Sequence, residues 1–172
     1  MRTKTFVLFT LAVTGLFFSA GTRKTSLTGG CHVGDFAPEI LVSGSEHAIQ
    51  FSGSAKQYTL VHFWAAYDAV SRVRNIQLHT KVNEMDSTRI RMYSVSMDEH
   101  FSVYAGTLKT DRLENTRQLF DGQGTRSPLY RQYNLKKGFG NFLIDGRGVI
   151  VATNVRPEDL ENIMFHASDR EN

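Results

Sequence analysis

The sequence predicts a single α/β domain in which a central mixed β-sheet has helices on both faces. Residues 58–65 are uncharged and rich in β-branched and aromatic side chains, which is typical of a strand buried on both faces. A helical pattern separates this strand from a second one at residues 90–97, and this order predicts a right-handed parallel crossover. Residues 141–145 and 149–154 are joined by a Gly-Arg-Gly turn and predict an antiparallel hairpin.

The length and composition fit one domain with a proper core, since the chain has 172 residues, of which 41% are hydrophobic and 22% charged. The first 21 residues have a basic start, an apolar run and a small-residue end, which is the layout of a secretory signal peptide. The apolar run is too short for a membrane span. We therefore expect a signal peptide at residues 1–21, a flexible Gly/Ser/Thr-rich leader at residues 22–32, a domain at residues 33–172, and export to the periplasm or cell envelope.

The charge argues against a nucleic-acid partner. The chain has 20 Lys and Arg against 17 Asp and Glu, a net charge of +3, but Arg2 and Lys4 belong to the expected signal peptide. Without these two residues the net charge falls to about +1. The remaining basic residues form no stripe along the sequence, so nucleic acid is not expected as a partner.

Cysteine usage leaves one thiol to explain. Exported proteins normally pair their cysteines, whereas this chain has only Cys31, within the expected leader. Three states of Cys31 stay open: attachment of a lipid, a free thiol, and a disulfide between two chains. Contact with a membrane is expected only if Cys31 is lipidated.

The other elements follow from shorter patterns. Two strand-like runs at residues 40–43 and 48–51 predict an additional N-terminal β-hairpin. Asp68 is a good N-cap for the helix that follows the first central strand. The apolar residues expected on the inward side of that helix are Val70, Val73, Ile76, Leu78, Val82 and Met85. Further helices are expected at residues 101–113, with Val103, Leu108 and Leu113 inward, from Ser127-Pro128, and from residues 157–159, whereas residues 114–124 are expected to be irregular.

Several short motifs occur together in the order and spacing of a known family. They are Gly-Asp-x-Ala-Pro at residues 34–38, Val-x-Phe-Trp-Ala at 61–65, Ser-Val-Ser-Met-Asp at 94–98, and Asn-Phe-Leu-Ile-Asp with Gly-Val-Ile at 141–150. Over about residues 33–167 the chain resembles the TlpA/ResA-like branch of the thioredoxin superfamily, which comprises exported thiol-disulfide oxidoreductases and AhpC/TSA-related proteins. The resemblance implies a thioredoxin-like three-layer sandwich.

The resemblance also locates the family's Cys-x-x-Cys motif, whose two cysteine positions correspond here to Asp68 and Ser71. Disulfide exchange needs a thiolate that attacks and a second thiol that resolves the mixed disulfide. Neither sulfur is present at these positions. We therefore expect a degenerate active site and a domain that is not a thiol-disulfide oxidoreductase of the usual kind.

A second departure concerns the cis-proline that precedes the Phe-Leu-Ile-Asp run in the family. In this chain the corresponding position is Phe139, followed by Gly140. Because a cis bond before a residue other than proline costs about 2.5–4 kcal/mol, we expect a trans bond between Gly138 and Phe139. The loop that holds substrate backbone in the family is therefore expected to have a different shape.

Two interpretations of the degenerate site stay open. In one, Asp68 only caps the helix, which contributes about 0.5–2 kcal/mol to stability. In the other, His62, Asp68 and Ser71 form a hydrolytic constellation, because all three lie near one strand-helix junction.

No cofactor or metal is expected. The six histidines never occur at His-x-His or His-x-x-x-His spacing, and cysteine pairs are absent. The Gly-x-Gly pairs at residues 122–124 and 138–140 lack the helix and lysine that phosphate binding would need. Asp98-Glu99-His100 is interpreted as a solvated strand end rather than a ligand cluster.

Two classes of function are therefore expected. The first is a redox-inactive thioredoxin-like module that binds an exported protein or peptide, or serves an envelope assembly. Its binding groove would be lined by Trp64, Tyr67, Phe139 and Gly140, although Trp64 and Tyr67 are also common as core or rim aromatics. The alternative is an oxidoreductase of the cell envelope that uses Cys31 with an external thiol.

Overall fold

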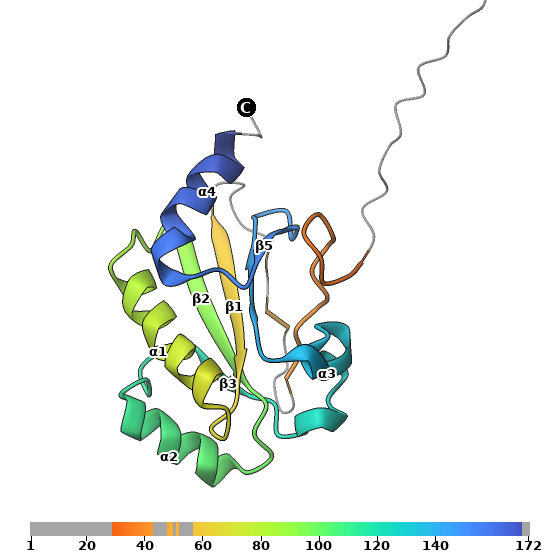
Figure 1. The fold of residues 1–172 in the computed structure, drawn as a ribbon, viewed down its shortest axis with the longest axis vertical. Coiled ribbons are helices and arrows are strands. Elements are labelled where there is room, and N and C mark those ends of the chain that lie inside the picture. Colours follow the sequence, from red (N-terminus) through yellow and green to blue (C-terminus); the bar gives the residue numbers. More distant parts are fainter. Residues whose placement is uncertain (1–28, 43–47, 50, 52–56, 170–172) are drawn as a thin grey trace, which may run out of the picture.

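The computed structural model describes residues 29–42, 48–49, 51 and 57–169 (Figure 1). The expected signal peptide and most of the expected leader lie outside the described residues. The expected N-terminal hairpin lies partly outside them as well, and one backbone hydrogen bond, from Ile49 N to Ile40 O at 2.9 Å, joins its two runs.

A mixed five-stranded sheet forms the centre of the domain, with the strand order β3-β2-β1-β4-β5. Its strands are β1 (Tyr58–Trp64), β2 (Ile90–Ser96), β3 (Gln118–Phe120), β4 (Asn141–Ile144) and β5 (Ile150–Thr153). β1 pairs with β2 in parallel and with β4 in antiparallel, and all seven of its residues are buried. The predicted central strand, crossover and late hairpin are therefore confirmed.

The edge strand β3 was not expected, because residues 114–124 carry no strand pattern. It is only three residues long and half-buried, and it pairs in parallel with Ser94–Ser96 of β2. The neighbouring strand, rather than the sequence of β3 itself, makes this segment extended.

Helices cover both faces of the sheet, as predicted (Figure 1). On one face Leu78 of α1 (Ala69–Asn83) and Leu160 and Met164 of α4 (Leu160–Asp169) pack against Leu60 and its neighbours. On the other face Leu129 of α3 (Pro128–Gln132) and the nearby Tyr133 pack against Phe63. At the carboxyl end of β1, α2 (Phe101–Asp111) covers Trp64.

The inward side of α1 is more polar than predicted. Its buried residues are Ser71, Asn75, Leu78 and His79, whereas Val70 and Val73 are 79% and 52% exposed. The expectation of an apolar inward stripe that includes these two valines is therefore wrong. In α2, similarly, Leu108 is buried but Val103 is exposed.

The buried polar residues of α1 are paired with the sheet. Ser94 Oγ of β2 donates to Asn75 Oδ1 at 2.6 Å, and His79 Nε2 lies 3.0 Å from the same hydroxyl. Gln118 of β3 contacts His79 Nε2 at 2.8 Å. Hydrogen bonds therefore replace part of the apolar contact between this helix and the sheet. No helix in the part of the chain that the structure describes is long and apolar enough to cross a membrane.

Candidate functional site

The candidate site lies where β1 ends and α1 begins. Asp68 has extended backbone angles and is the N-cap residue of α1, with Oδ1 accepting a hydrogen bond from Ser71 N at 2.7 Å. The Ser71 hydroxyl donates back to Asp68 O at 3.1 Å, and Ser71 is 2% exposed. The first of these bonds satisfies one of the free N–H groups at the start of the helix, that of Ser71. The capping interpretation of Asp68 is thus confirmed.

His62 does not complete a hydrolytic constellation. Its Nε2 lies 2.9 Å from the backbone oxygen of Ser71, and because a carbonyl oxygen only accepts, this nitrogen donates. Burial lowers the pKa of His62 to about 4, partly opposed by the hydrogen bond to the Ser71 carbonyl. His62 therefore holds backbone rather than the Ser71 hydroxyl, and Asp68 is engaged with a backbone N–H. The hydrolytic interpretation is wrong for this geometry.

The two aromatic residues expected beside the site do meet. The rings of Tyr67 and Phe139 lie with centroids 6.2 Å apart and planes inclined by 60°. Tyr67 is 71% exposed, and Phe139 is partly buried. No peptide bond among the described residues is cis, so the Gly138–Phe139 bond is trans as expected. The carbonyl of Gly140 accepts from Phe63 N at 3.0 Å, which ties the loop to β1.

Trp64 does not line this surface. It is fully buried, with its ring centroid 6.2 Å from that of Tyr104 in a cluster with Leu108 and Leu113. Its indole nitrogen has no hydrogen-bond partner among the described residues. The expected groove must be corrected at this residue, because the strand pleat points Trp64 towards α2 and away from solvent.

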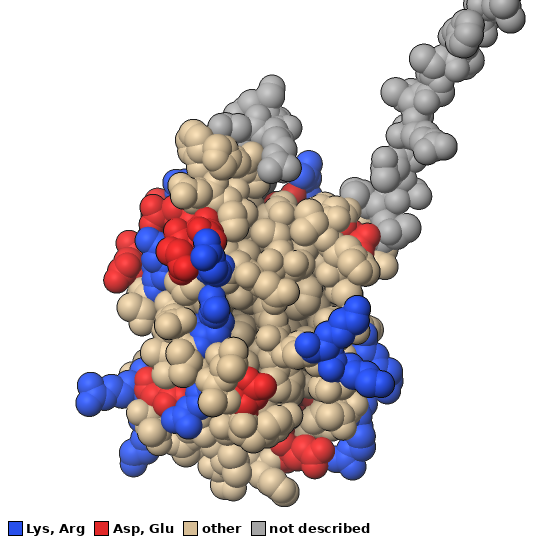
Figure 2. Space-filling model, viewed as in Figure 1, with Lys and Arg blue, Asp and Glu red and all other residues tan. Residues whose placement is uncertain are grey.

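The first turns of α1, which follow Tyr67 closely in the chain, expose two further apolar residues. Val70 and Val73 lie three residues apart at the start of α1 and therefore share a helix face. We call Tyr67, Val70, Val73 and Phe139 the Tyr67 surface. Figure 2 shows that uncharged surface predominates at the lower end of the molecule, which α1 and α2 reach with their N-terminal turns.

Carboxylates surround Tyr67 and fix the turn that carries it. Asp98 is 3% exposed, and its two oxygens accept from Ala66 N at 3.0 and 3.1 Å, while Oδ2 accepts from Ser96 Oγ at 2.7 Å. The interpretation of Asp98 as a solvated strand end is therefore wrong. Partial burial and then the nearby charge of Asp98 raise the pKa of Tyr67, so its phenol is neutral at physiological pH.

Cys31 lies closer to the site than its place in the sequence suggests. The segment around it is held to the sheet edge, with Gly34 N donating to Ile150 O at 2.8 Å and Ile150 N donating to Asp35 O at 2.9 Å. Cys31 is partly buried against the core, and it lines a cleft of about 310 Å³ together with Phe139. The thiol therefore shares a cleft with one member of the Tyr67 surface.

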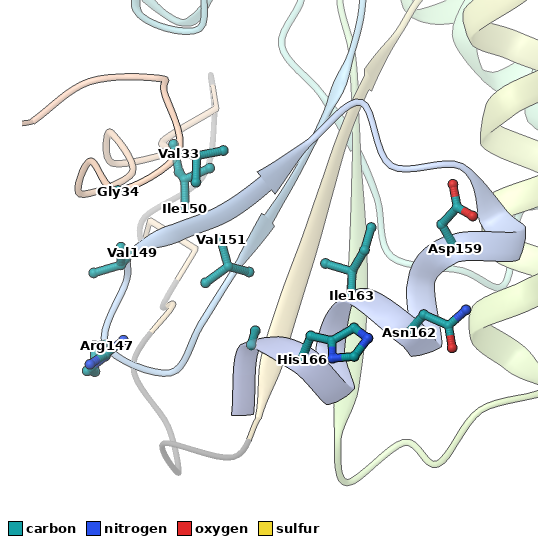
Figure 3. Close-up of a pocket in the computed structure, with 11 residues that line it drawn as sticks. Val33, Gly34, Arg147, Val149, Ile150, Val151, Asp159, Asn162, Ile163 and His166 are labelled. Atoms are coloured by element: carbon teal, nitrogen blue, oxygen red, sulfur yellow. The ribbon is translucent and has the colours of Figure 1, made fainter. Parts of the chain in front are cut away.

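Another hollow, of about 760 Å³, lies between β5 and α4 (Figure 3). Val151 and Ile163 are among its lining residues, and none of the site residues predicted from the sequence lines it. Within the described ranges no three His, Cys, Asp or Glu side chains gather in a way that could hold a metal ion.

Comparison with known proteins identifies the family. The sequence matches no family model and no curated protein.

Among solved structures, a thioredoxin-like protein from Parabacteroides distasonis shares 47% sequence identity and superposes with a TM-score of 0.73 over 81% of this chain and 98% of that one. The thioredoxin domain of a thiol-disulfide oxidoreductase from Bacteroides vulgatus has 22% identity and a TM-score of 0.64 over 78% of this chain and 96% of its own. A thiol-disulfide oxidoreductase from Bacteroides fragilis has 22% identity and a TM-score of 0.64 over 77% and 99%, respectively. These two establish the fold, and the identity and coverage of the first show that the chain belongs to the thioredoxin-like family.

Proposed function

We propose that this chain is an exported, redox-inactive thioredoxin-like protein that binds an exported protein or peptide through the Tyr67 surface. The observation that carries the proposal is the hydrogen-bonded pair at the helix start. One N–H group that would lower the pKa of a thiol there, that of Ser71, instead donates to Asp68 Oδ1 at 2.7 Å. Neither side chain can attack or resolve a disulfide.

The exposure of the surrounding residues supports the binding part of the proposal. Three of the four residues of the Tyr67 surface are more than half exposed, at 71% for Tyr67, 79% for Val70 and 52% for Val73. Apolar side chains grouped on a surface mark sites of interaction with other proteins, and tyrosine is enriched at the centres of such sites. Phe101, at the start of α2, is a further exposed aromatic residue at 63%.

Site-specific photo-crosslinking in the producing cells tests the binding proposal. A photoreactive residue in place of Val70 is expected to give one dominant crosslinked partner, and Tyr67→Ser combined with Phe139→Ser is expected to remove that product. Phe165→Ser is the matched control, because Phe165 is 58% exposed on α4, away from this surface. Crosslinking that survives the double substitution, or that Phe165→Ser removes equally, would contradict the assignment.

A second candidate function rests on Cys31, because its thiol lines the same cleft as Phe139. In this alternative, the Cys31 thiolate attacks a disulfide of an exported protein, one sulfur leaves as thiolate, and a mixed disulfide forms. An external thiol then attacks the mixed disulfide, which releases the Cys31 thiolate and transfers the new disulfide to the external partner.

Insulin reduction in the presence of dithiothreitol separates the two candidates. The redox-inactive protein is expected to leave the rate of insulin precipitation at that of dithiothreitol alone. A faster rate that Cys31→Ser abolishes would reject redox inactivity and support the second candidate.

A further inference from the structure

A further cleft lies at the C-terminal end of α1, along the part of the β2 edge that β3 does not cover. β3 pairs only with Ser94–Ser96, so the first half of β2, which starts at Ile90, has no strand beside it on this side in the described part of the chain. A cleft of about 690 Å³ opens there. The last two turns of α1, the start of β2 and the segment after α2 line it, and no residue of the Tyr67 surface takes part.

The lining of this cleft carries charge of one sign. Arg91, Arg112 and Arg117 line it, and none of its lining residues is Asp or Glu. Glu84 and Asp86, which lie close to this end of α1, line a separate hollow together with Arg89 and Glu161. We call the cleft lined by Arg91, Arg112 and Arg117 the arginine cleft. Three positive charges gather in it although the net charge of the whole chain is only +3.

The arginines are positioned by specific local contacts. Arg91 Nε donates to Thr59 Oγ1 at 3.2 Å, and the guanidinium of Arg117 lies 5.9 Å from the centre of the Tyr93 ring. Arg112 follows α2 with left-handed backbone angles (φ 58°, ψ 41°), a position at which glycine is usual because it has no Cβ. An arginine is thus accepted there in spite of a conformational cost.

Two of these charges are uncompensated within the described residues. Arg112 and Arg117 form no ion pair there, whereas other arginines of the domain do. Arg72, for example, makes a bidentate pair with Asp111, with Nε–Oδ2 at 2.7 Å and Nη2–Oδ1 at 2.5 Å. Placing like charges in one concave region raises the local positive potential, which an anion would neutralise.

Polar groups complete the lining. Asn83 and Asn115 supply amide N–H donors, and His79 lies at the buried side of the cleft. Desolvation by burial lowers the pKa of His79 to about 4, so its ring is neutral at physiological pH. Guanidinium and amide donors around a positively charged hollow are the groups that bind phosphoryl oxygens.

We propose that the arginine cleft binds a soluble small molecule through a phosphate or sulfate ester group. A cleft of about 690 Å³ is much larger than one such group and leaves room for the organic part of the ligand. The site is independent of the Tyr67 surface and of the proposed function, since it shares no residue with either.

Calorimetric titration of the purified protein with glucose 1-phosphate and with pyrophosphate tests the proposal, with glucose as the uncharged comparison. Saturable binding of at least one phosphorylated probe is expected, together with none of glucose. Arg112→Gln and Arg117→Gln are each expected to weaken that binding about tenfold, as the loss of a charge-assisted hydrogen bond would. Both side chains are exposed, so the fold should persist, and circular dichroism checks this.

Arg131→Gln is the matched control, because it removes an exposed arginine of α3 and leaves the cleft intact. Equal weakening by Arg131→Gln would mean that only the net charge matters, which would overturn the site. Absence of saturable binding by either phosphorylated probe would overturn it as well. Binding to phosphatidylglycerol vesicles is measured as well. Vesicle binding that Arg112→Gln or Arg117→Gln weakens, without binding of the soluble probes, would reject a soluble ligand in favour of a lipid headgroup.

Discussion

The carboxylate of Asp68 lies 2.7 Å from the backbone nitrogen of Ser71, so the side chain at one of the two positions that the sequence predicts for the family's cysteines holds the backbone of the other. The bond keeps the strand-helix junction of a thioredoxin-like domain while both sulfurs are absent. Asp68 therefore caps the start of α1 at this junction.

Removal of the cap should destabilise the domain. Asp68→Ala is expected to lower the free energy of unfolding by about 0.5–2 kcal/mol, because Ser71 N loses its acceptor. Asp68→Asn keeps a side-chain acceptor and should lose less. Urea denaturation of both variants measures the difference, and equal stability of the alanine variant and the parent protein would contradict the role of the cap.

Cysteines introduced at positions 68 and 71 should give the protein thiol-disulfide chemistry. Asp68→Cys combined with Ser71→Cys places two thiols at the start of α1, where the helix dipole lowers the pKa of a thiol. We expect dithiothreitol-dependent insulin reduction above the background rate from the double variant, and none from either single variant. A folded double variant that carries both thiols and leaves the rate at background would contradict this prediction.

Two apolar residues of α1 should differ in their effect on stability. Val70→Ser is expected to change the free energy of unfolding by less than about 0.5 kcal/mol, because the side chain is 79% exposed. Leu78→Ala should cost about 2–5 kcal/mol, since Leu78 is fully buried between α1 and the sheet. Thermal or chemical unfolding of the two variants side by side provides the measurement, and a large loss in Val70→Ser would mean that this face of α1 is not a free surface.

Stability should fall on mild acidification because of two histidines. The pKa values of His62 and His79 are lowered by burial from 6.5 to about 4. The unfolded chain therefore binds more protons than the folded one between these values, so the stabilisation is complete above about pH 6.5 and is lost as the pH falls towards 4. Each histidine accounts for a loss on the order of 3 kcal/mol. Chemical denaturation at several pH values should show this slope, and a smaller one in His79→Gln.

Asp121 should make a contribution to stability that falls, rather than rises, as the pH increases. It is 1% exposed, and Oδ1 has no hydrogen-bond partner among the described residues. Burial raises the pKa of Asp121 above its ordinary value of 3.8, so the folded state holds the proton more tightly. This contribution to stability is complete below pH 3.8 and is lost as the pH rises through the raised pKa of the folded state. Asp121→Asn is therefore expected to stabilise the protein at pH 7 more than at pH 3. Denaturation curves at both pH values decide this, and a variant that is less stable at pH 7 than at pH 3 relative to the parent would contradict it.

The sequence predicted those features of the fold that depend on strong local patterns. The uncharged run of β1, the Asp68 cap and the Gly148 turn, with φ 86°, each follow from chemistry within a few residues. β3 could not be predicted, because three residues become a strand only through pairing with β2.

Of the residues that the sequence predicts for the groove, Tyr67 and Phe139 do lie close together, whereas Trp64 is buried elsewhere. Trp64 is buried because the pleat of β1 points it towards α2. Val70 and Val73 are exposed because α1 packs on the sheet through polar side chains, whereas apolar spacing alone predicts that they face the sheet. Cys31 lies in a cleft with Phe139 because its segment is held by hydrogen bonds to residues far away in the chain, such as the bond from Gly34 N to Ile150 O. A linear pattern contains no sign of such contacts.

The polar contacts between α1 and the sheet fix the position of both ends of this helix. A helix that docks through apolar side chains tolerates a small rotation or slide, because one methyl group can replace another. Here a rotation by one residue would break the bonds of Asn75 and His79 to Ser94 and leave buried donors and acceptors unpaired. Helix α1 is therefore held in a single orientation on the sheet. The Tyr67 surface at its first turn and the arginine cleft at its last turn keep a fixed position relative to each other.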